Sequence, residues 1–249
     1  MSDDGKDQQL QVPATEPQRQ PIFNLPFAVA ALCGLFLAIH AAQSLVLNDS
    51  GREQLLTWFA FVPYRAIDPA GVPGGIWPLF WTPITHAFLH AGWEHVLLNT
   101  VWFAIFATPV TQRYGPVKML VLFVLGAIVG AAAFAATTLP QIQVLVGASG
   151  GIAALTGAAV RFIFQPLQVA VNPETGERVA LGRKLATIPE VFRHPTARIF
   201  TLTWVILNGV VPLLPMFFGG VDVQVAWQAH LGGFLLGFFL VPLLERRPQ

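Results

Sequence analysis

Residues 147–164 read GASGGIAALTGAAVRFIF, the short apolar stretch around which we expect the fold to be built. Its apolar run, Ser149–Phe164, is typical of a membrane helix, although a full span needs about 20 residues. Ser149, Ala153 and Gly157 share one helical face, on which no side chain is larger than alanine. Because small residues let helix backbones approach closely in lipid, this stretch predicts a short helix packed tightly inside a bundle.

Five further apolar segments surround this stretch. Together the six predicted membrane helices are Pro26–Leu47, Trp93–Val110, Val117–Ala136, Ser149–Phe164, Ala197–Phe218 and Gln224–Leu244. The composition agrees, since 54% of the residues are hydrophobic and only 11% are charged, against about 25% charged in soluble proteins. We therefore expect an all-α membrane protein, a bundle of six transmembrane helices over residues 26–244. The formal net charge of +1 does not indicate the strongly basic surface that nucleic-acid-binding proteins carry.

The polar segments between and beyond these helices predict the orientation. Residues 1–25 are expected to be a disordered cytoplasmic tail, 48–91 an outer interfacial loop rich in Pro, Gly and Trp, 165–196 a cytoplasmic loop with a turn or small hairpin near Asn172, and 245–249 a cytoplasmic tail. With the N-terminus inside, only Arg52 and Arg65 of the 14 Lys and Arg residues fall on the outer side. Basic residues favour the cytoplasmic side, so both termini are predicted to be cytoplasmic.

Four polar residues from three predicted helices fall at one level of the membrane. Ser149 begins the fourth helix at its outer end, His230 lies near the outer end of the sixth, and His95 and Asn99 lie at the outer end of the second. Taken singly, they have ordinary explanations: a small residue for packing, a histidine hydrogen-bonded inside the bundle, and an asparagine joining helices. Their joint occurrence favours chemistry, because polar residues are costly in a membrane.

The positions of these residues along the predicted helices support this interpretation. His230, Gly233 and Gly237 share a face of the sixth helix, so that helix is expected to pack closely on the fourth and to bring His230 within hydrogen-bond reach of Ser149. An imidazole can then accept the proton of a serine nucleophile. His95 and Asn99 are four residues apart, so both can point at a developing oxyanion. No carboxylate lies in the interior of a predicted span, since Glu94 is at the start of the second and Asp222 is in a loop; this favours a Ser-His dyad over a triad.

Two other chemistries are disfavoured. Residues 147–151 fit the Gly-x-Ser-x-Gly elbow of α/β-hydrolases, but no alternation of strands and helices surrounds them. A zinc site is a second possibility, because histidines stand at positions 86, 90 and 95. The His-Glu-x-x-His motif is absent, however, and residues 90–95 have one residue too many for the inverted motif His-x-x-Glu-His. We therefore expect neither a metal nor a cofactor.

The sequence resembles the rhomboid family of intramembrane serine proteases from about Trp81 to Leu244. The resemblance rests on three motifs: His90-x4-His95-x3-Asn99, Gly147-Ala148-Ser149-Gly150 and Ala229-His230-Leu231-Gly232-Gly233. It implies that Ser149 is the nucleophile, that His230 is the general base, and that His95, Asn99 and the Ser149 N–H form the oxyanion hole. It also implies that His90 supports the nearby loop and that Gly233 permits close packing. Two positions depart from the family pattern: Thr82 replaces the arginine of a Trp-Arg pair, and Ala153 replaces a tyrosine that stacks on the histidine.

The resemblance predicts an endopeptidase of the cell inner membrane. Its substrates would be transmembrane segments of other proteins, cut near the outer membrane face. Three alternatives remain: a proteolytically inactive relative that binds membrane clients, a small transporter or channel, and an intramembrane chaperone. An inactive relative is expected to lose the serine or the histidine, and a transporter to show repeats. The natural substrate and the oligomeric state are left open by the sequence.

Overall fold

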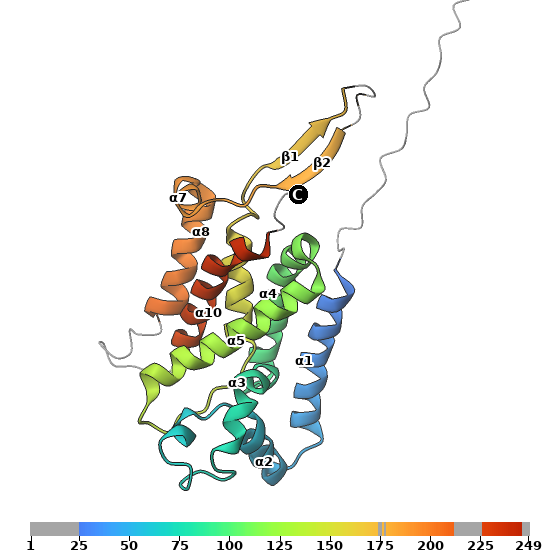
Figure 1. The fold of residues 1–249 in the computed structure, drawn as a ribbon. Helices are drawn as coiled ribbons and strands as arrows, with labels where there is room; N and C mark the ends of the chain where they lie inside the picture. The colour runs from blue at the N-terminus through green and yellow to red at the C-terminus, as the bar shows by residue number, and fades with distance from the viewer. Residues whose placement is uncertain (1–24, 174–175, 177, 212–225, 246–249) are drawn as a thin grey trace, which may run out of the picture.

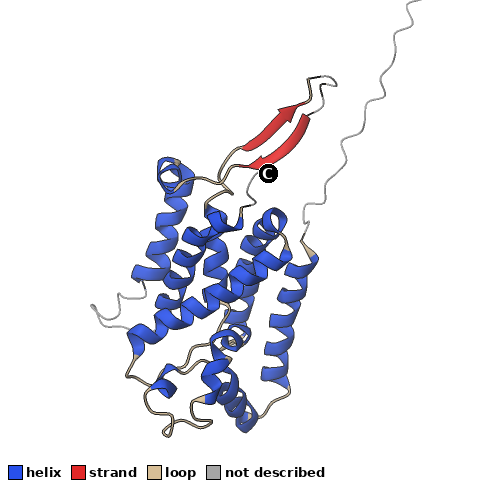
Figure 2. Ribbon diagram, viewed as in Figure 1, coloured by secondary structure: helices blue, strands red, loops and turns tan. Residues whose placement is uncertain are grey.

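The computed structural model describes residues 25–173, 176, 178–211 and 226–245. Over this part of the chain, helices make up the body and a single two-stranded sheet projects from it (Figures 1 and 2). The longer helices are α1 (Phe27–Leu45), α2 (Asp49–Phe59), α4 (Trp93–Tyr114), α5 (Pro116–Thr138), α6 (Ser149–Val160), α8 (Pro195–Val205) and α10 (Trp227–Leu240). The shorter elements are the 3-10 turns η1 (Pro63–Ala66), η2 (Trp77–Phe80), η3 (His86–Phe88) and η6 (Val241–Leu244), the helical turns α3 (Thr82–Thr85) and α7 (Ile188–Arg193), the π-helical turn η4 (Ile206–Val210), and the strands β1 (Leu167–Val171) and β2 (Arg178–Arg183).

Three of the described helices are long and apolar enough to cross a membrane. They are α1, α5 and the continuous segment Trp227–Leu244, which joins α10 to η6. The 22-residue α4 is longer than its predicted span, because it continues past Pro109 to Tyr114. The end of the fifth predicted span, the start of the sixth, and residues 1–24 and 246–249 of the predicted tails lie outside the described residues.

Local sequence explains where α2, α4 and α5 begin or end. Gly115 has a φ of +84°, a conformation that favours glycine, and it separates α4 from α5. Pro116 then begins α5, at a helical position whose N–H has no intrahelical partner. Within the predicted outer loop, Asn48 caps α2 by accepting a hydrogen bond from the Gly51 N–H at 2.9 Å.

Helix α6 is the centre of the bundle. Every residue from Gly150 to Val160 is buried. Glycines bring its neighbours close: a methyl group added at Gly126 of α5, or at Gly237 of α10, would collide with Ala154 of α6. Gly157 of α6 in turn lies against the backbone of Phe234 of α10. The close helix packing predicted from small residues is therefore present on two sides of α6.

The two ends of the bundle carry different elements. The β1–β2 hairpin and α7 lie at the end where α1 begins, and α2 and α3 lie at the opposite end (Figure 1). The strands are antiparallel, with Leu167 paired to Arg183, Val171 paired to Arg178 and an irregularity after Gln168. The hairpin lies where the sequence predicts a turn; residues 174, 175 and 177 of that turn are outside the described part.

Candidate active site

Ser149 is the first residue of α6, and the chain before it is held in a conformation that needs glycine. Gly147 has a φ of +118°, and its N–H donates a hydrogen bond to the His86 carbonyl oxygen at 2.9 Å. The first N–H groups of a helix have no intrahelical partner and form the positive end of its dipole. Ser149 is half-buried. The Ser149 N–H is therefore one of the helix-terminal donors suited to a negative charge.

His95 and Asn99 face this loop from the first two turns of α4. A methyl group added at Gly147 would lie 2.7 Å from Cε1 and Nε2 of His95 and 3.6 Å from Nδ2 of Asn99. The Asn99 amide nitrogen is buried and has no hydrogen-bond partner among the described residues. The spacing of four residues thus places both side chains beside Gly147, two residues before Ser149.

His230 lies in the first turn of α10, the helix that packs on α6. The residue before it, Ala229, places its carbonyl oxygen 2.9 Å from a methyl group added at Gly130 and 3.6 Å from one added at Gly150. A methyl group at Gly233 would collide with the Gly150 carbonyl oxygen. His230 Nδ1 is buried without a partner, and within the described residues no hydrogen bond joins Ser149 and His230. The two helices meet as the small residues predict, but the hydrogen bond expected between Ser149 and His230 is not formed in this structure.

His90 lies behind His95 and connects the site to α1. Its ring is fully buried and meets the His95 ring edge-on, with centroids 5.1 Å apart. From α1, the Gln43 side chain donates to the His90 carbonyl oxygen at 3.3 Å, and the His40 ring lies 6.4 Å from that of His90. Sequence reasoning missed both α1 residues. Their signal was a group of polar residues, His40, Gln43 and Ser44, near the end of a predominantly apolar helix.

Arg65 organises the loop formed by residues 57–75, and sequence reasoning missed this role as well. Its side chain is fully buried and donates to the carbonyl oxygens of Thr57 at 2.6 Å, of Gly75 at 3.0 Å and of Pro73. Burial away from water lowers the pKa of the Arg65 guanidinium. The position after Trp81 is Thr82, so the buried guanidinium of this loop is that of Arg65.

Two further features bear on the site. Ala153 is buried against Gly233, since a methyl group added at Gly233 would lie 3.3 Å from the Ala153 Cβ. In the described part of the chain, no three His, Cys, Asp or Glu side chains are placed to hold a metal ion.

Comparison with known proteins agrees with the motifs. The family model described as the Rhomboid domain matches residues 78–247. The chain is 28% identical over 170 residues to RHOMBOID-like protein 5 of Arabidopsis thaliana, covering 68% of this chain and 45% of that protein. It is 27% identical to the putative rhomboid protease YdcA of Bacillus subtilis, covering 91% and 92%, and 23% identical to the rhomboid protease GlpG of Yersinia pestis, covering 87% and 61%. The chain thus spans about half the length of the Arabidopsis relative and about three fifths of GlpG. With its apolar helices and a family domain over most of its length, this membrane protein belongs to the rhomboid family.

Proposed function

We propose that the chain is an intramembrane serine endopeptidase that uses Ser149 as nucleophile and His230 as general base. One observation carries the proposal: Gly147, two residues before Ser149, lies against His95 and Asn99, while Gly150, the residue after the serine, lies against Gly233 of the helix that bears His230. Three segments far apart in the sequence thus contribute a nucleophile, a base and hydrogen-bond donors to one place.

The reaction follows from these positions. Ser149 Oγ attacks the carbonyl carbon of a peptide bond as His230 accepts the hydroxyl proton. Negative charge then develops on the carbonyl oxygen, where the His95 ring, the Asn99 amide and the Ser149 N–H donate hydrogen bonds. His230 returns the proton to the leaving amine, an acyl-enzyme forms, and water releases it by the same steps in reverse order. Loss of one such donor typically costs about 10²–10³ in rate.

The remaining parts of the chain fit a six-helix arrangement. We propose that residues 26–244 form the membrane domain, that residues 1–25 and 245–249 lie in the cytoplasm, and that the protein resides in the cell inner membrane. The N-terminus of α6 adjoins η3 of the 48–91 loop through the hydrogen bond from Gly147 to His86. Because that loop is assigned to the outer side, substrate transmembrane segments are expected to be cut near the outer face.

The test is covalent labelling of the full-length protein in detergent by a serine-directed fluorophosphonate. Labelling is expected in the unmodified protein and in Ser50→Ala, whose serine is exposed in α2, and is expected to be lost in Ser149→Ala and His230→Ala. Cleavage of a single-span substrate, with the cut mapped, then reports the reaction itself. Equal labelling of all four proteins would reject the dyad. Capture of membrane clients without any labelling would instead support a proteolytically inactive, client-binding relative.

A further inference from the structure

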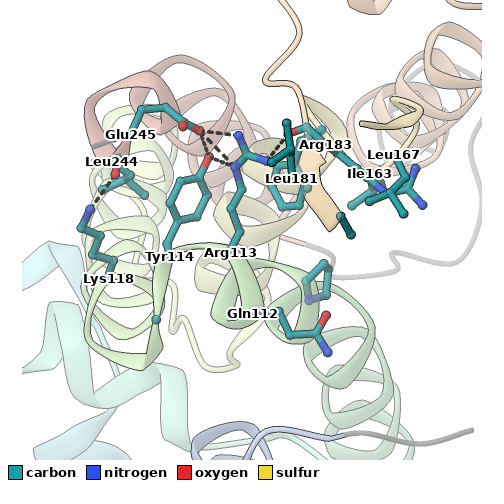
Figure 3. Close-up of a pocket in the computed structure, with 15 residues that line it drawn as sticks. Gln112, Arg113, Tyr114, Lys118, Ile163, Leu167, Leu181, Arg183, Leu244 and Glu245 are labelled. Atoms are coloured by element: carbon teal, nitrogen blue, oxygen red, sulfur yellow. Dashed lines mark hydrogen bonds and ion pairs between the residues drawn. The ribbon is translucent and has the colours of Figure 1, made fainter. Parts of the chain in front are cut away.

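A pocket of about 900 Å³ lies at the hairpin end of the bundle, away from Ser149. It is formed by the turn between α4 and α5, by the base of the hairpin, and by the residues after α10 (Figure 3). Its polar lining includes Arg113, Tyr114, Lys118, Arg183 and Glu245. The proposed proteolysis does not use this pocket, so its charged lining residues need a separate explanation.

The pocket carries an excess of positive charge, because three cations face one carboxylate. Glu245 is already engaged: its Oε1 lies 2.8 Å from Nη2 of Arg113 and accepts a hydrogen bond from the Tyr114 hydroxyl at 2.6 Å (Figure 3). Lys118 donates one described hydrogen bond, to the Leu244 carbonyl oxygen at 2.6 Å. Exposed Arg183 donates one, to the Gln165 carbonyl oxygen. Lys118 and Arg183 therefore keep N–H groups for an anion.

The surroundings of the pocket are apolar on the side of the bilayer. Phe162 and Leu181 line it. Immediately outside, Val117, next to Lys118, is 73% exposed and Leu243 is 77% exposed. Val117, Leu120 and Val121 share one exposed face of α5, a helix apolar enough to span the membrane. A pocket lined by more cations than carboxylates thus opens beside an exposed apolar surface of α5.

We propose that this pocket binds the headgroup of an anionic phospholipid from the leaflet on the hairpin side. Lys118 and Arg183, which lie on opposite sides of the Arg113–Glu245 ion pair (Figure 3), attract the negatively charged headgroup from either side of the pocket, and an acyl chain lies along the Val117 face of α5. Basic pockets at the ends of membrane helices favour anionic lipids, because each nearby Lys or Arg attracts the negative headgroup. A lipid bound here touches α5 and β2 together, so it fixes the hairpin to the bundle.

Lipid binding to the full-length protein in neutral detergent micelles tests this proposal. Phosphatidylglycerol is titrated, binding is counted by native mass spectrometry, and the thermal unfolding midpoint is followed in parallel. Phosphatidylcholine is the neutral lipid, and glycerol 3-phosphate supplies the headgroup chemistry without acyl chains. The variants are Lys118→Gln, Arg183→Gln and their combination. Arg198→Gln, which removes an exposed cation outside the pocket lining, is the matched control.

Phosphatidylglycerol is expected to bind and to raise the unfolding midpoint, whereas phosphatidylcholine is not. Each substitution should weaken binding by about fivefold and the pair by about 25-fold, with Arg198→Gln unchanged. Lys118→Arg should restore binding, which separates charge from misfolding. Equal binding by the double variant and the unmodified protein would overturn the assignment. If glycerol 3-phosphate stabilises the protein as much as phosphatidylglycerol does, the ligand is not a lipid and the pocket is a site for a soluble anion. Neither outcome depends on whether Ser149 is catalytic.

Discussion

Gly147 is the residue whose backbone most constrains the candidate site. Its φ of +118° lies in the region that L-residues with a side chain rarely adopt, and the space where its Cβ would be is 2.7 Å from the His95 ring. Glycine is therefore needed here twice, once for backbone conformation and once for space. A substitution at this position therefore combines backbone strain with displacement of His95, and a control variant is needed to separate the two effects.

We predict that Gly147→Ala lowers the fluorophosphonate labelling rate by about 10²-fold, because the added methyl group displaces a proposed oxyanion donor. The matched control is Gly115→Ala. Gly115 also has a positive φ, but nothing lies within 4 Å of its Cβ position. The control is expected to lower stability by about 1–2 kcal/mol, because alanine is strained at a positive φ. The folded Gly115→Ala protein should keep the labelling rate of the unmodified protein. Equal loss in both variants would show that strain, not displacement of His95, causes the effect.

Arg65 acts at the same scale through the loop. We predict that Arg65→Gln destabilises the protein by about 3 kcal/mol, since buried carbonyl oxygens lose a charged donor. Amide hydrogen exchange should show the loss first in residues 57–75. Glu53→Gln, an exposed substitution in α2, is expected to change stability by less than about 0.5 kcal/mol. Unchanged exchange in that loop would mean that Arg65 does not organise it.

At the scale of elements, α6 and α10 meet through glycines rather than through interlocking side chains. Gly233 and Gly237 of α10 face Gly150 and Ala154 of α6, with no room for a methyl group. Such contacts allow the closest approach that two helices can make, and van der Waals packing of this kind drives helix association in lipid. The distance between the serine helix and the histidine helix is thus set by backbone atoms.

Gly237→Val is accordingly predicted to lower stability by about 3 kcal/mol and to reduce labelling, because overpacking forces the two helices apart. Thermal unfolding in detergent measures the first effect and fluorophosphonate reactivity the second. Gly34→Ala in α1 is the matched control, since no atom lies within 4 Å of its Cβ position; it should not destabilise the protein. A Gly237→Val protein as stable as the control would contradict close packing of α6 and α10.

Helix α7 offers a pH-dependent element. Glu190 accepts from Lys184 at 2.8 Å and from the Thr187 N–H at 2.7 Å, and these bonds lower its pKa from 4.5 to about 2. A lowered pKa stabilises the folded state above pH 4.5, and this contribution is lost as the pH falls towards 2. Glu190→Gln should therefore reduce hydrogen-exchange protection of α7 at pH 6 and have a much smaller effect near pH 2. The same difference at both pH values would exclude this role for the carboxylate.

Sequence reasoning succeeded where the cause was local and periodic. The four-residue step from His95 to Asn99 fixes their common direction on a helix, and the small face of α6 follows from the same period. The end of α4 was missed, because a proline near a helix terminus can be tolerated and the positive φ of Gly115 decides where the helix stops. The role of Arg65 was missed because it depends on loop carbonyl groups eight to ten residues away, whose placement no periodicity encodes.

At the scale of the whole molecule, the bundle has two chemically different ends. The hairpin and the basic pocket lie at one end, and α2 with the tryptophan-bearing loop lies at the other (Figure 1). The pocket combines the α4–α5 turn, β2 and Glu245, which lie far apart in the sequence. The distribution of Lys and Arg in the sequence therefore predicts which end of the bundle faces the cytoplasm. It does not reveal the pocket.

Orientation is testable with single cysteines in a Cys33→Ser background. We predict that Ser50→Cys, in α2, reacts with a membrane-impermeant maleimide in cells whose outer face is accessible. Gln168→Cys, in β1, should react only after the membrane is permeabilised. Both positions are exposed in the folded protein, so access to reagent, not burial, decides the result. Reaction of the hairpin cysteine from outside would reverse the proposed topology.

The length and enclosure of α6 also constrain how the protein is made. Twelve residues give a helix about 18 Å long, well short of the about 30 Å of bilayer hydrocarbon. Such a segment is a poor candidate for independent insertion by the translocation machinery. Its partner α10 emerges from the ribosome more than sixty residues later. During synthesis α4 and α5 are therefore available to pack on the serine-bearing segment before α10, whose arrival completes the contacts that bury α6.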